Sequence, residues 1–377
     1  MHDQLLLSNA RIVTADAVVD GALLAREGRI VEVRPAAGPM PGALDCEGDW
    51  LLPGLVELHT DNLERQFSPR IGVRWPAAAA MLTHDAQIAA AGITTVGDAV
   101  CVGYHGGKSE RLDYLNLSID VLRRAMAARA LKADHFLHLR LELADPHMID
   151  LFEPLMGEPS VRLISFMDHT PGQRQYRDLD RFRALHSGRS EAELDELVAQ
   201  RIRLQREHTD RQRETVLRLI AGHPAVRASH DDTTPEHVEE AVACGCRIAE
   251  FPTTLAAAEA ARLRGLSIVM GAPNLVLGGS HSGNVSAADL VERGLLDVLS
   301  SDYVPASLLH GAFLLHQGFG IAMPEAVAPV TRAPADLLGL ADRGRLAPGL
   351  RADLIRVREV GGTPTVVAVW REGRRIA

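Results

Sequence analysis

The sequence predicts an α/β protein whose main part is a (β/α)8 TIM barrel, accompanied by a small β-sandwich domain built from both ends of the chain. Three observations lead to this prediction. Both ends contain short β-like runs, the middle alternates short apolar runs with helices, and 377 residues suit one barrel with one small partner domain. With 46% hydrophobic and 24% charged residues, the composition is that of a globular protein.

The two ends of the chain supply strands without helical periodicity. Near the N-terminus the apolar runs are short, and Arg26-Glu27-Gly28 is a typical hairpin turn. Two further β-like runs lie between residues 352 and 370. Because neither end is long enough to bury a core alone, we expect residues 1–51 and 344–377 to form one β-sandwich domain and residues 52–343 the barrel.

The middle of the chain repeats strand-like and helical segments. The clearest strand-like runs are 92–96, 136–142, 161–167, 247–251 and 267–270. Short, continuously apolar strands separated by helices are typical of a parallel sheet that is covered on both faces. One segment departs from this repeat. Residues 190–223 are predicted to form a long charged helix, with acidic residues in its first turns and arginines later. A solvated insertion is the simpler interpretation of this helix, and a lid or partner surface is the other.

Composition excludes several classes of protein. Apolar stretches stop well short of the roughly 18 residues that a membrane helix needs, and the N-terminus lacks the basic head of a secretory signal. We therefore expect no membrane contact and a cytoplasmic protein. The net charge of -9 argues against a nucleic-acid-binding surface. Four cysteines give no disulfide framework.

Residues that bind metals stand where the predicted strands end. His59 and Asp61 close the first barrel strand, and their spacing of two puts both side chains on one face. Later runs end in Glu142, in Asp168-His169, in His230-Asp231-Asp232 and in Asp302. Any one of these residues could simply cap a helix. Together, imidazoles and carboxylates at one mouth of a barrel predict a site for one or two divalent ions, with Zn²⁺ or Mn²⁺ favoured.

Two segments resemble the amidohydrolase superfamily, and the resemblance extends over nearly the whole chain. They are the run 52–59, Leu-Pro-Gly-Leu-Val-Glu-Leu-His, and the run 344–354 near the C-terminus. The resemblance implies a distorted barrel with a β-sandwich from both termini and one or two divalent metals. It also implies the metal ligands, which are His59, Asp61, Glu142, His169, His230 and Asp302.

The chain departs from the superfamily pattern at two points. His59-Thr60-Asp61 stands where His-x-His is usual, which gives the first metal a more oxygen-rich set of ligands. Only two of the 40 basic residues are lysines, Lys108 and Lys132, and neither is placed to carry the bridging carbamate. Glu142 is therefore expected to bridge the metals.

A narrower resemblance is to the diphosphohydrolases of the carbon-phosphorus lyase pathway. The runs that carry it include 59–64, 69–76, 166–173, 230–234 and 271–274. It implies hydrolysis of a ribose 1-alkylphosphonate 5-triphosphate, such as the 1-methylphosphonate, with loss of diphosphate to leave the 5-phosphate. The expected partner is thus a polyanionic small molecule. Asp302 is expected to take the proton from the attacking water, with Glu142 as the second catalytic carboxylate.

Candidate substrate contacts come from loops and arginines. The Gly/Ser loop 277–284 lacks the lysine of a P-loop, so an ordinary flexible loop and a phosphate cradle are about equally expected there. We expect phosphate contact from Arg174, whereas for Arg140 phosphate contact and pairing with a carboxylate are both open and pairing is favoured. The other candidate substrate contacts are His105, Lys108, Ser280, His281, Ser282 and Asn284. His84, in a helical setting without a paired ligand, is expected to be structural.

Two other functions compete with phosphorus–oxygen hydrolysis. The same barrel could hydrolyse a cyclic amide or deaminate a nucleobase-like substrate, because a fold does not fix a reaction. The chain could instead be a non-catalytic scaffold subunit of a phosphonate-processing complex, in which case it would carry no metal. A homodimer is the expected assembly if the chain associates with itself.

Overall fold

The computed structural model describes residues 4–36, 38–70, 72–103, 110–280 and 283–377. His105, Lys108, His281 and Ser282, which the sequence suggests as substrate contacts, lie outside the described residues. The chain divides into two compact units. The terminal unit consists of Met1–Asp98, Val121–Phe136 and Asp297–Ala377, and the central unit consists of Ala99–Asp120 and Leu137–Leu296.

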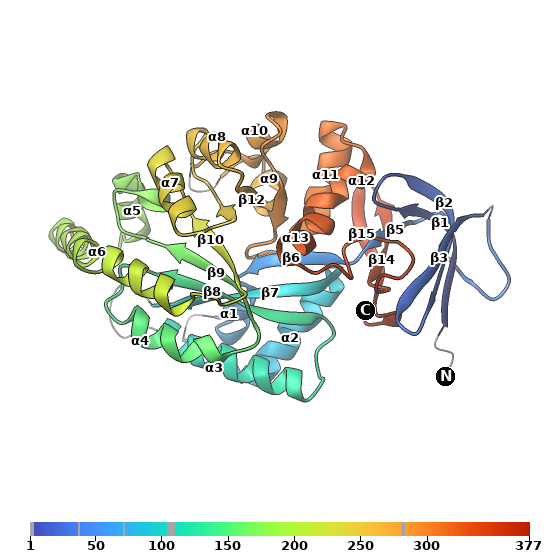
Figure 1. The fold of residues 1–377 in the computed structure, drawn as a ribbon, viewed down its shortest axis with the longest axis horizontal. Coiled ribbons are helices and arrows are strands. Elements are labelled where there is room, and N and C mark those ends of the chain that lie inside the picture. Colours follow the sequence, from blue (N-terminus) through green and yellow to red (C-terminus); the bar gives the residue numbers. More distant parts are fainter. Residues whose placement is uncertain (1–3, 37, 71, 104–109, 281–282) are drawn as a thin grey trace. The chain divides into compact units, whose positions relative to one another are not determined.

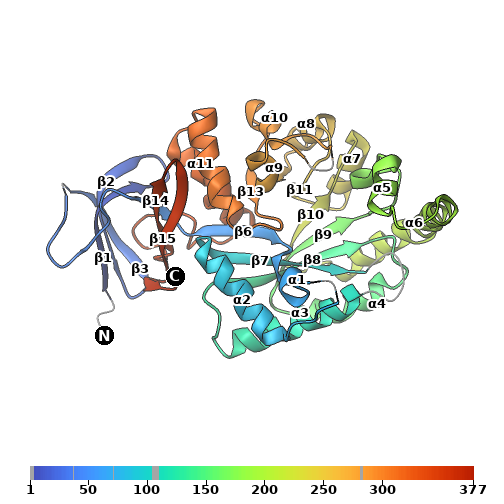
Figure 2. The same cartoon turned by 180° about the vertical axis from the view of Figure 1, so that it is seen from behind.

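A mainly antiparallel sheet in the terminal unit is built from both ends of the chain, as predicted (Figure 1). Its strands are β1 (Gln4–Val13), β2 (Val18–Arg26), β3 (Arg29–Pro35), β4 (Leu44–Asp45), β5 (Trp50–Pro53), β14 (Leu354–Val360), β15 (Thr363–Arg371) and β16 (Arg374–Arg375). They follow the order β16-β15-β14-β5-β1-β2-β3, with β4 beside β1. Figure 2 shows β1, β2 and β3 from one end of the chain and β14 and β15 from the other.

The hairpin predicted at Arg26-Glu27-Gly28 is confirmed. Arg26 pairs with Arg29, which leaves Glu27 and Gly28 as a two-residue loop, and both have positive φ of 49° and 77°. Such a loop matches the twist of the two strands that it joins. The inner face of the sheet buries one apolar cluster, which includes Leu7, Ile12, Leu23, Leu51, Leu354 and Trp370.

The second sheet has eight strands in the order β13-β12-β11-β10-β9-β8-β7-β6. They are β6 (Leu55–Thr60), β7 (Ile93–Val102), β8 (Asp134–Glu142), β9 (Val161–Met167), β10 (Val226–His230), β11 (Ile248–Glu250), β12 (Ser267–Gly271) and β13 (Val298–Ser300). The strands run parallel. A parallel bridge between Thr60 and Asp302 joins the end of β6 to the segment after β13, so the barrel is nearly closed. The predicted TIM barrel is confirmed.

Helices alternate with the barrel strands, as a parallel sheet requires. They are α1 (Asn62–Phe67), α2 (Ala77–Ala90), α3 (Glu110–Ala127), α4 (Met148–Phe152), η1 (Glu153–Gly157), η2 (Arg174–Tyr176), α5 (Leu179–Leu185), α6 (Glu191–Leu219), α7 (Pro235–Ala243), α8 (Leu255–Leu263), α9 (Ala272–Val276), α10 (Ala287–Glu292), α11 (Ser307–Phe319), α12 (Met323–Val327), η3 (Ala328–Val330) and α13 (Arg332–Leu337). Among the described residues, no helix is both long and apolar enough to cross a membrane.

The long charged helix predicted over residues 190–223 is α6. Ser190 and Glu193 form a reciprocal capping box at its start, which satisfies two otherwise unpaired backbone N–H groups. The helix packs against α4, and Gln212 donates a hydrogen bond to the backbone carbonyl of Asp145. α6 is thus anchored on one side, although most of its surface is polar.

Candidate functional site

His59, Asp61 and Asp302 come together in the terminal unit. One ligand atom from each lies within 4.8 Å of the others, and His59 Nε2 is 3.7 Å from Asp61 Oδ1. His59 is buried, whereas Asp61 and Asp302 are half-buried and accessible to a small molecule. These are three of the six metal ligands that the sequence suggests, and we call them the terminal-unit group.

Backbone hydrogen bonds fix the positions of this group. The Asp61 N–H donates to Asp302 O at 2.9 Å, and the Asp302 N–H donates to His59 O at 3.2 Å. The Thr60 hydroxyl also donates to Asp302 O, at 2.7 Å. Asp302 has a left-handed backbone with φ of 53°, a conformation that Asp and Asn tolerate better than most residues. Main-chain hydrogen bonds between the end of β6 and the turn after β13 therefore bring the three residues together.

Glu57 binds the main chain on both sides of the terminal-unit group and was not among the residues expected at the site. Its fully buried carboxylate accepts hydrogen bonds from the N–H groups of His59 at 2.7 Å and Ser301 at 2.6 Å, and from the Ser300 hydroxyl at 2.9 Å. Burial raises the pKa of Glu57 to about 6, and the hydrogen bonds limit the rise. The signal was present, because Glu57, His59 and Asp61 alternate on one face of a strand that is otherwise apolar.

A second group of ligand atoms lies in the central unit, at the ends of β9 and β10. His169, His230 and Asp231 each offer one ligand atom within 4.8 Å of the others. Asp231 Oδ2 is 3.7 Å from His169 Nε2 and 3.5 Å from His230 Nε2. Both histidines were expected as metal ligands, whereas Asp231 was expected only at the same strand end as His230. We call these three residues the central-unit group.

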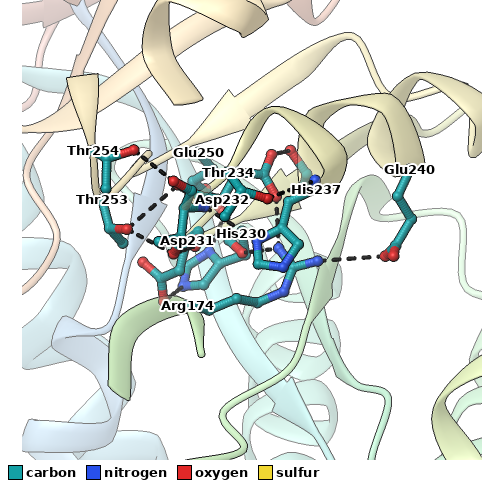
Figure 3. Close-up of polar contacts among 12 residues, drawn as sticks. Arg174, His230, Asp231, Asp232, Thr234, His237, Glu240, Glu250, Thr253 and Thr254 are labelled. Atoms are coloured by element: carbon teal, nitrogen blue, oxygen red, sulfur yellow. Dashed lines mark hydrogen bonds and ion pairs between the residues drawn. The ribbon is translucent and has the colours of Figure 1, made fainter. Parts of the chain in front are cut away.

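Carboxylates orient both histidines of the central-unit group. His230 Nδ1 lies 2.7 Å from Glu250 Oε2, and His169 Nδ1 lies 2.7 Å from Glu142 Oε2. When Nδ1 donates to a carboxylate, the lone pair is left on Nε2, and both Nε2 atoms lie toward Asp231. Figure 3 shows His230, Asp231 and Glu250 in this arrangement. Histidines that are held in this way are typical metal ligands.

Glu142 contacts His169 with both oxygens, since Oε1 also accepts from the His169 backbone N–H at 3.1 Å. This places Glu142 as the residue that orients His169, and its bridging of two metals stays a prediction. Burial alone would lower the pKa of His169, but Glu142 and Asp231 more than offset this and raise it to about 9. The central-unit group therefore carries surplus negative charge, which either a proton or a metal ion can balance.

The two predicted arginines have different surroundings. Arg140 Nη2 lies 3.3 Å from His230 Nε2, so this guanidinium is close to the central-unit group. Burial raises the pKa of Asp231, but interactions with His230, His169 and Arg140 lower it overall. Arg174 is buried and donates to Asp232, to Glu240 and to the carbonyl of His230 (Figure 3). Protein groups thus contact the Arg174 guanidinium, and its contact with phosphate stays a prediction.

The described part of the Gly/Ser loop includes Ser280 and Asn284, both half-buried. Arg177 donates to the carbonyl of Gly283 at 3.4 Å, and the Arg181 guanidinium lies against the same glycine. A Cβ atom on Gly283 would come within 2.3 Å of Arg181 Nη1, so a larger residue would displace this arginine. The loop thus has two cationic neighbours that the sequence analysis did not identify.

A third cluster in the terminal unit contains residue types that bind metals but is arranged to hold a proton. His135 places Nδ1 2.8 Å from Asp98 and Nε2 3.1 Å from Asp85. Because both ring nitrogens face carboxylate oxygens, both carry hydrogen and His135 is an imidazolium. His84 lies 2.7 Å from Asp98 and accepts from Asn62 at 2.9 Å. His84 thus has partners that were not expected, and its structural role stays a prediction.

This cluster makes the stability of the protein dependent on pH. Burial by itself lowers the pKa of His135, but Asp98 and Asp85 raise it to about 9, above its ordinary value of 6.5. The stabilisation is complete below pH 6.5 and is lost as the pH rises toward 9. We expect the difference in unfolding free energy between wild type and His135→Gln to shrink from pH 6.5 to pH 9 in chemical denaturation. A difference that is constant or grows over this range would contradict the charged state of His135.

A known enzyme resembles this chain along its whole length. It is 42% identical over 377 residues to the alpha-D-ribose 1-methylphosphonate 5-triphosphate diphosphatase of Escherichia coli K12, a match that covers 99% of this chain and 100% of that protein. A dihydroorotase of Methanopyrus kandleri is 39% identical over 88 residues, which cover 18% of this chain and 21% of that protein. No family model matches the chain.

Solved structures share the fold at low sequence identity. The N-acetyl-D-glucosamine-6-phosphate deacetylase of Mycobacterium smegmatis superposes with a TM-score of 0.65 at 18% identity, covering 99% of this chain and 100% of that chain. An amidohydrolase crystal structure superposes with a TM-score of 0.62 at 17% identity, covering 99% of this chain and 98% of that chain. These similarities support the barrel with a terminal β domain.

Proposed function

Because the chain belongs to the alpha-D-ribose 1-methylphosphonate 5-triphosphate diphosphatase family, within the amidohydrolase superfamily, we propose that it hydrolyses that triphosphate with the help of divalent metal. Water attacks the α-phosphorus, and the bond between this phosphorus and the oxygen that bridges to the β-phosphate breaks. The products are diphosphate and alpha-D-ribose 1-methylphosphonate 5-phosphate. The observation that carries the proposal is the pair of histidine–carboxylate groups at the barrel strand ends.

The donor chemistry of each group fits a divalent ion. The terminal-unit group offers one imidazole and two carboxylates, and the central-unit group offers two imidazoles and one carboxylate. Such nitrogen and oxygen donors suit Zn²⁺ or Mn²⁺. When bound, a divalent ion lowers the pKa of a coordinated water and draws charge from phosphate oxygens. The two groups together offer ligand atoms for one or two divalent ions.

Within this proposal, the protein side chains have distinct tasks. Asp302 is half-buried and fixed by its backbone, and it accepts the proton of the attacking water. Arg140, next to His230, supplies positive charge toward phosphate oxygens. Glu250 and Glu142 hold the ring orientations of the two histidines. The proton acceptor thus comes from the segment after β13, and the guanidinium comes from β8.

The arginines beside Gly283 are expected to bind the anionic chain of the substrate. Tyr176, directly before Arg177, packs its ring 5.9 Å from that of His169, so this segment extends from the central-unit group to the Gly/Ser loop. We expect the double variant Arg177→Gln, Arg181→Gln to raise KM at least 10-fold with kcat nearly unchanged, corresponding to about 1.4 kcal/mol or more. Arg189→Gln, an exposed neighbour, is the matched control. An unchanged KM in steady-state kinetics would refute this role.

Metal removal tests the proposal. We expect protein purified without chelator to hold one or two equivalents of Zn²⁺ or Mn²⁺ per chain by elemental analysis. Dialysis against a chelator should abolish diphosphate release, and adding the ion back should restore it. Less than about 0.1 metal per chain together with no restored activity would favour a scaffold. Activity on a cyclic amide but not on the triphosphate would favour the amide-hydrolysing alternative.

A further inference from the structure

Arg174 is buried close to the central-unit group and has an unusual backbone conformation. It opens η2, shortly after His169, and its backbone is left-handed with φ of 47°. Such a conformation is costly for a long side chain and persists only where the surroundings enforce it. The side chain is 8% exposed, so the guanidinium lies inside the protein.

The guanidinium binds the segment that follows β10 at two places. Nη1 donates to Asp232 Oδ1 at 2.6 Å and to the carbonyl oxygen of His230 at 3.1 Å. Asp232 is also held from the other side, because the Ser229 hydroxyl donates to Oδ2. The contacts therefore lie on either side of Asp231, the carboxylate of the central-unit group (Figure 3).

A third contact fixes the guanidinium itself. Nη2 lies 3.4 Å from Glu240 Oε1 on α7, and the same oxygen accepts from Arg213 of α6 at 2.8 Å. Arg174 thereby joins the loop that carries His169 to the strand end that carries His230 and Asp231. Only a planar guanidinium provides several donors in this fixed geometry, and the point charge of a lysine does not.

We propose that Arg174 is a positioning residue of the central-unit group, which keeps His230 and Asp231 in place relative to His169, and that it does not contact substrate. The inference rests on the proposed metal-dependent function. It assigns Arg174 an effect on metal affinity and turnover, because residues that orient metal ligands typically change these by about 10- to 100-fold.

The test compares Arg174→Gln and Arg174→Lys with the matched control Arg213→Gln, whose guanidinium pairs with Glu240 and Asp210. Zn²⁺ and Mn²⁺ alone are titrated into metal-free protein, and kcat and KM are measured separately. We expect both Arg174 variants to lose about 10- to 100-fold in metal affinity and in kcat, with KM within about twofold of wild type. The Arg213 variant should keep wild-type metal affinity.

A KM raised 10-fold or more with unchanged metal affinity would overturn the proposal and return Arg174 to phosphate binding. Unchanged metal affinity and kcat would overturn it as well. If Arg174→Gln does not fold, Asp232→Asn breaks the same contact from the other partner and should weaken metal binding to a similar extent. Metal titration uses no phosphonate substrate, so a lack of diphosphatase activity in wild type would refute the proposed function without deciding the role of Arg174.

Discussion

Asp302→Asn is expected to lower kcat for diphosphate release by about 10²- to 10⁴-fold, the usual contribution of a positioned general base. Asparagine keeps the shape of the side chain but cannot accept the proton of the attacking water. It also tolerates the left-handed backbone at φ of 53°, and the main-chain N–H and C=O groups of residue 302, which are hydrogen-bonded, are unchanged by the substitution. The variant should therefore fold like wild type while losing turnover.

The comparison needs three measurements on the same preparations. Steady-state kinetics give kcat, and elemental analysis gives the metal content. Thermal unfolding shows whether the variant is folded and as stable as wild type. Asp16→Asn, an exposed change of the same kind, is the control and should have wild-type activity. Diphosphate release by Asp302→Asn at the wild-type rate would remove Asp302 from the proton transfer.

Asp98→Asn is expected to lower the free energy of unfolding by about 3–5 kcal/mol, the usual cost of removing one partner from a buried ion pair. His135 would keep its buried charge but lose the oxygen that lies 2.8 Å from Nδ1. Asp98 also contacts His84 at 2.7 Å, so the substitution disturbs two histidines at once. Chemical denaturation at pH 6.5 measures the effect.

A second substitution separates charge from packing. Adding His135→Gln to Asp98→Asn removes the uncompensated imidazolium, so the double variant should be less destabilised than the sum of the single variants. Asp150→Asn, at an exposed position, should change stability by less than about 0.5 kcal/mol. Additive effects of the two core substitutions would show that Asp98 and His135 are not coupled through charge.

The barrel and the strand-end positions of the candidate ligands could be predicted because they follow from local patterns. The spacing of two between His59 and Asp61 puts both on one face of β6, and parallel strands bring their carboxyl ends to one mouth. His169, His230 and Asp302 stand at equivalent strand ends and could be recognised in the same way. None of these inferences requires knowledge of which side chains touch.

The rest of the site depends on contacts between distant segments. Glu250 lies at the end of a short strand and shows its role only through its bond to His230, 20 residues earlier. The pairing of His135 with Asp98 and Asp85 is likewise invisible in the sequence. The phosphate contact expected of Arg174 stays a prediction, whereas its left-handed backbone and its burial were not foreseen. A sequence pattern does not determine such backbone reversals at non-glycine residues.

The most direct test is hydrolysis of alpha-D-ribose 1-methylphosphonate 5-triphosphate by the metal-loaded protein in ¹⁸O-labelled water, followed by ³¹P NMR. We predict one diphosphate for each 5-phosphate formed, with the label in the 5-phosphate, because attack occurs at the α-phosphorus. Chelator-treated protein should form neither product. Turnover that is unaffected by chelation, release of single phosphates, or no turnover of this substrate would contradict metal-dependent diphosphate release.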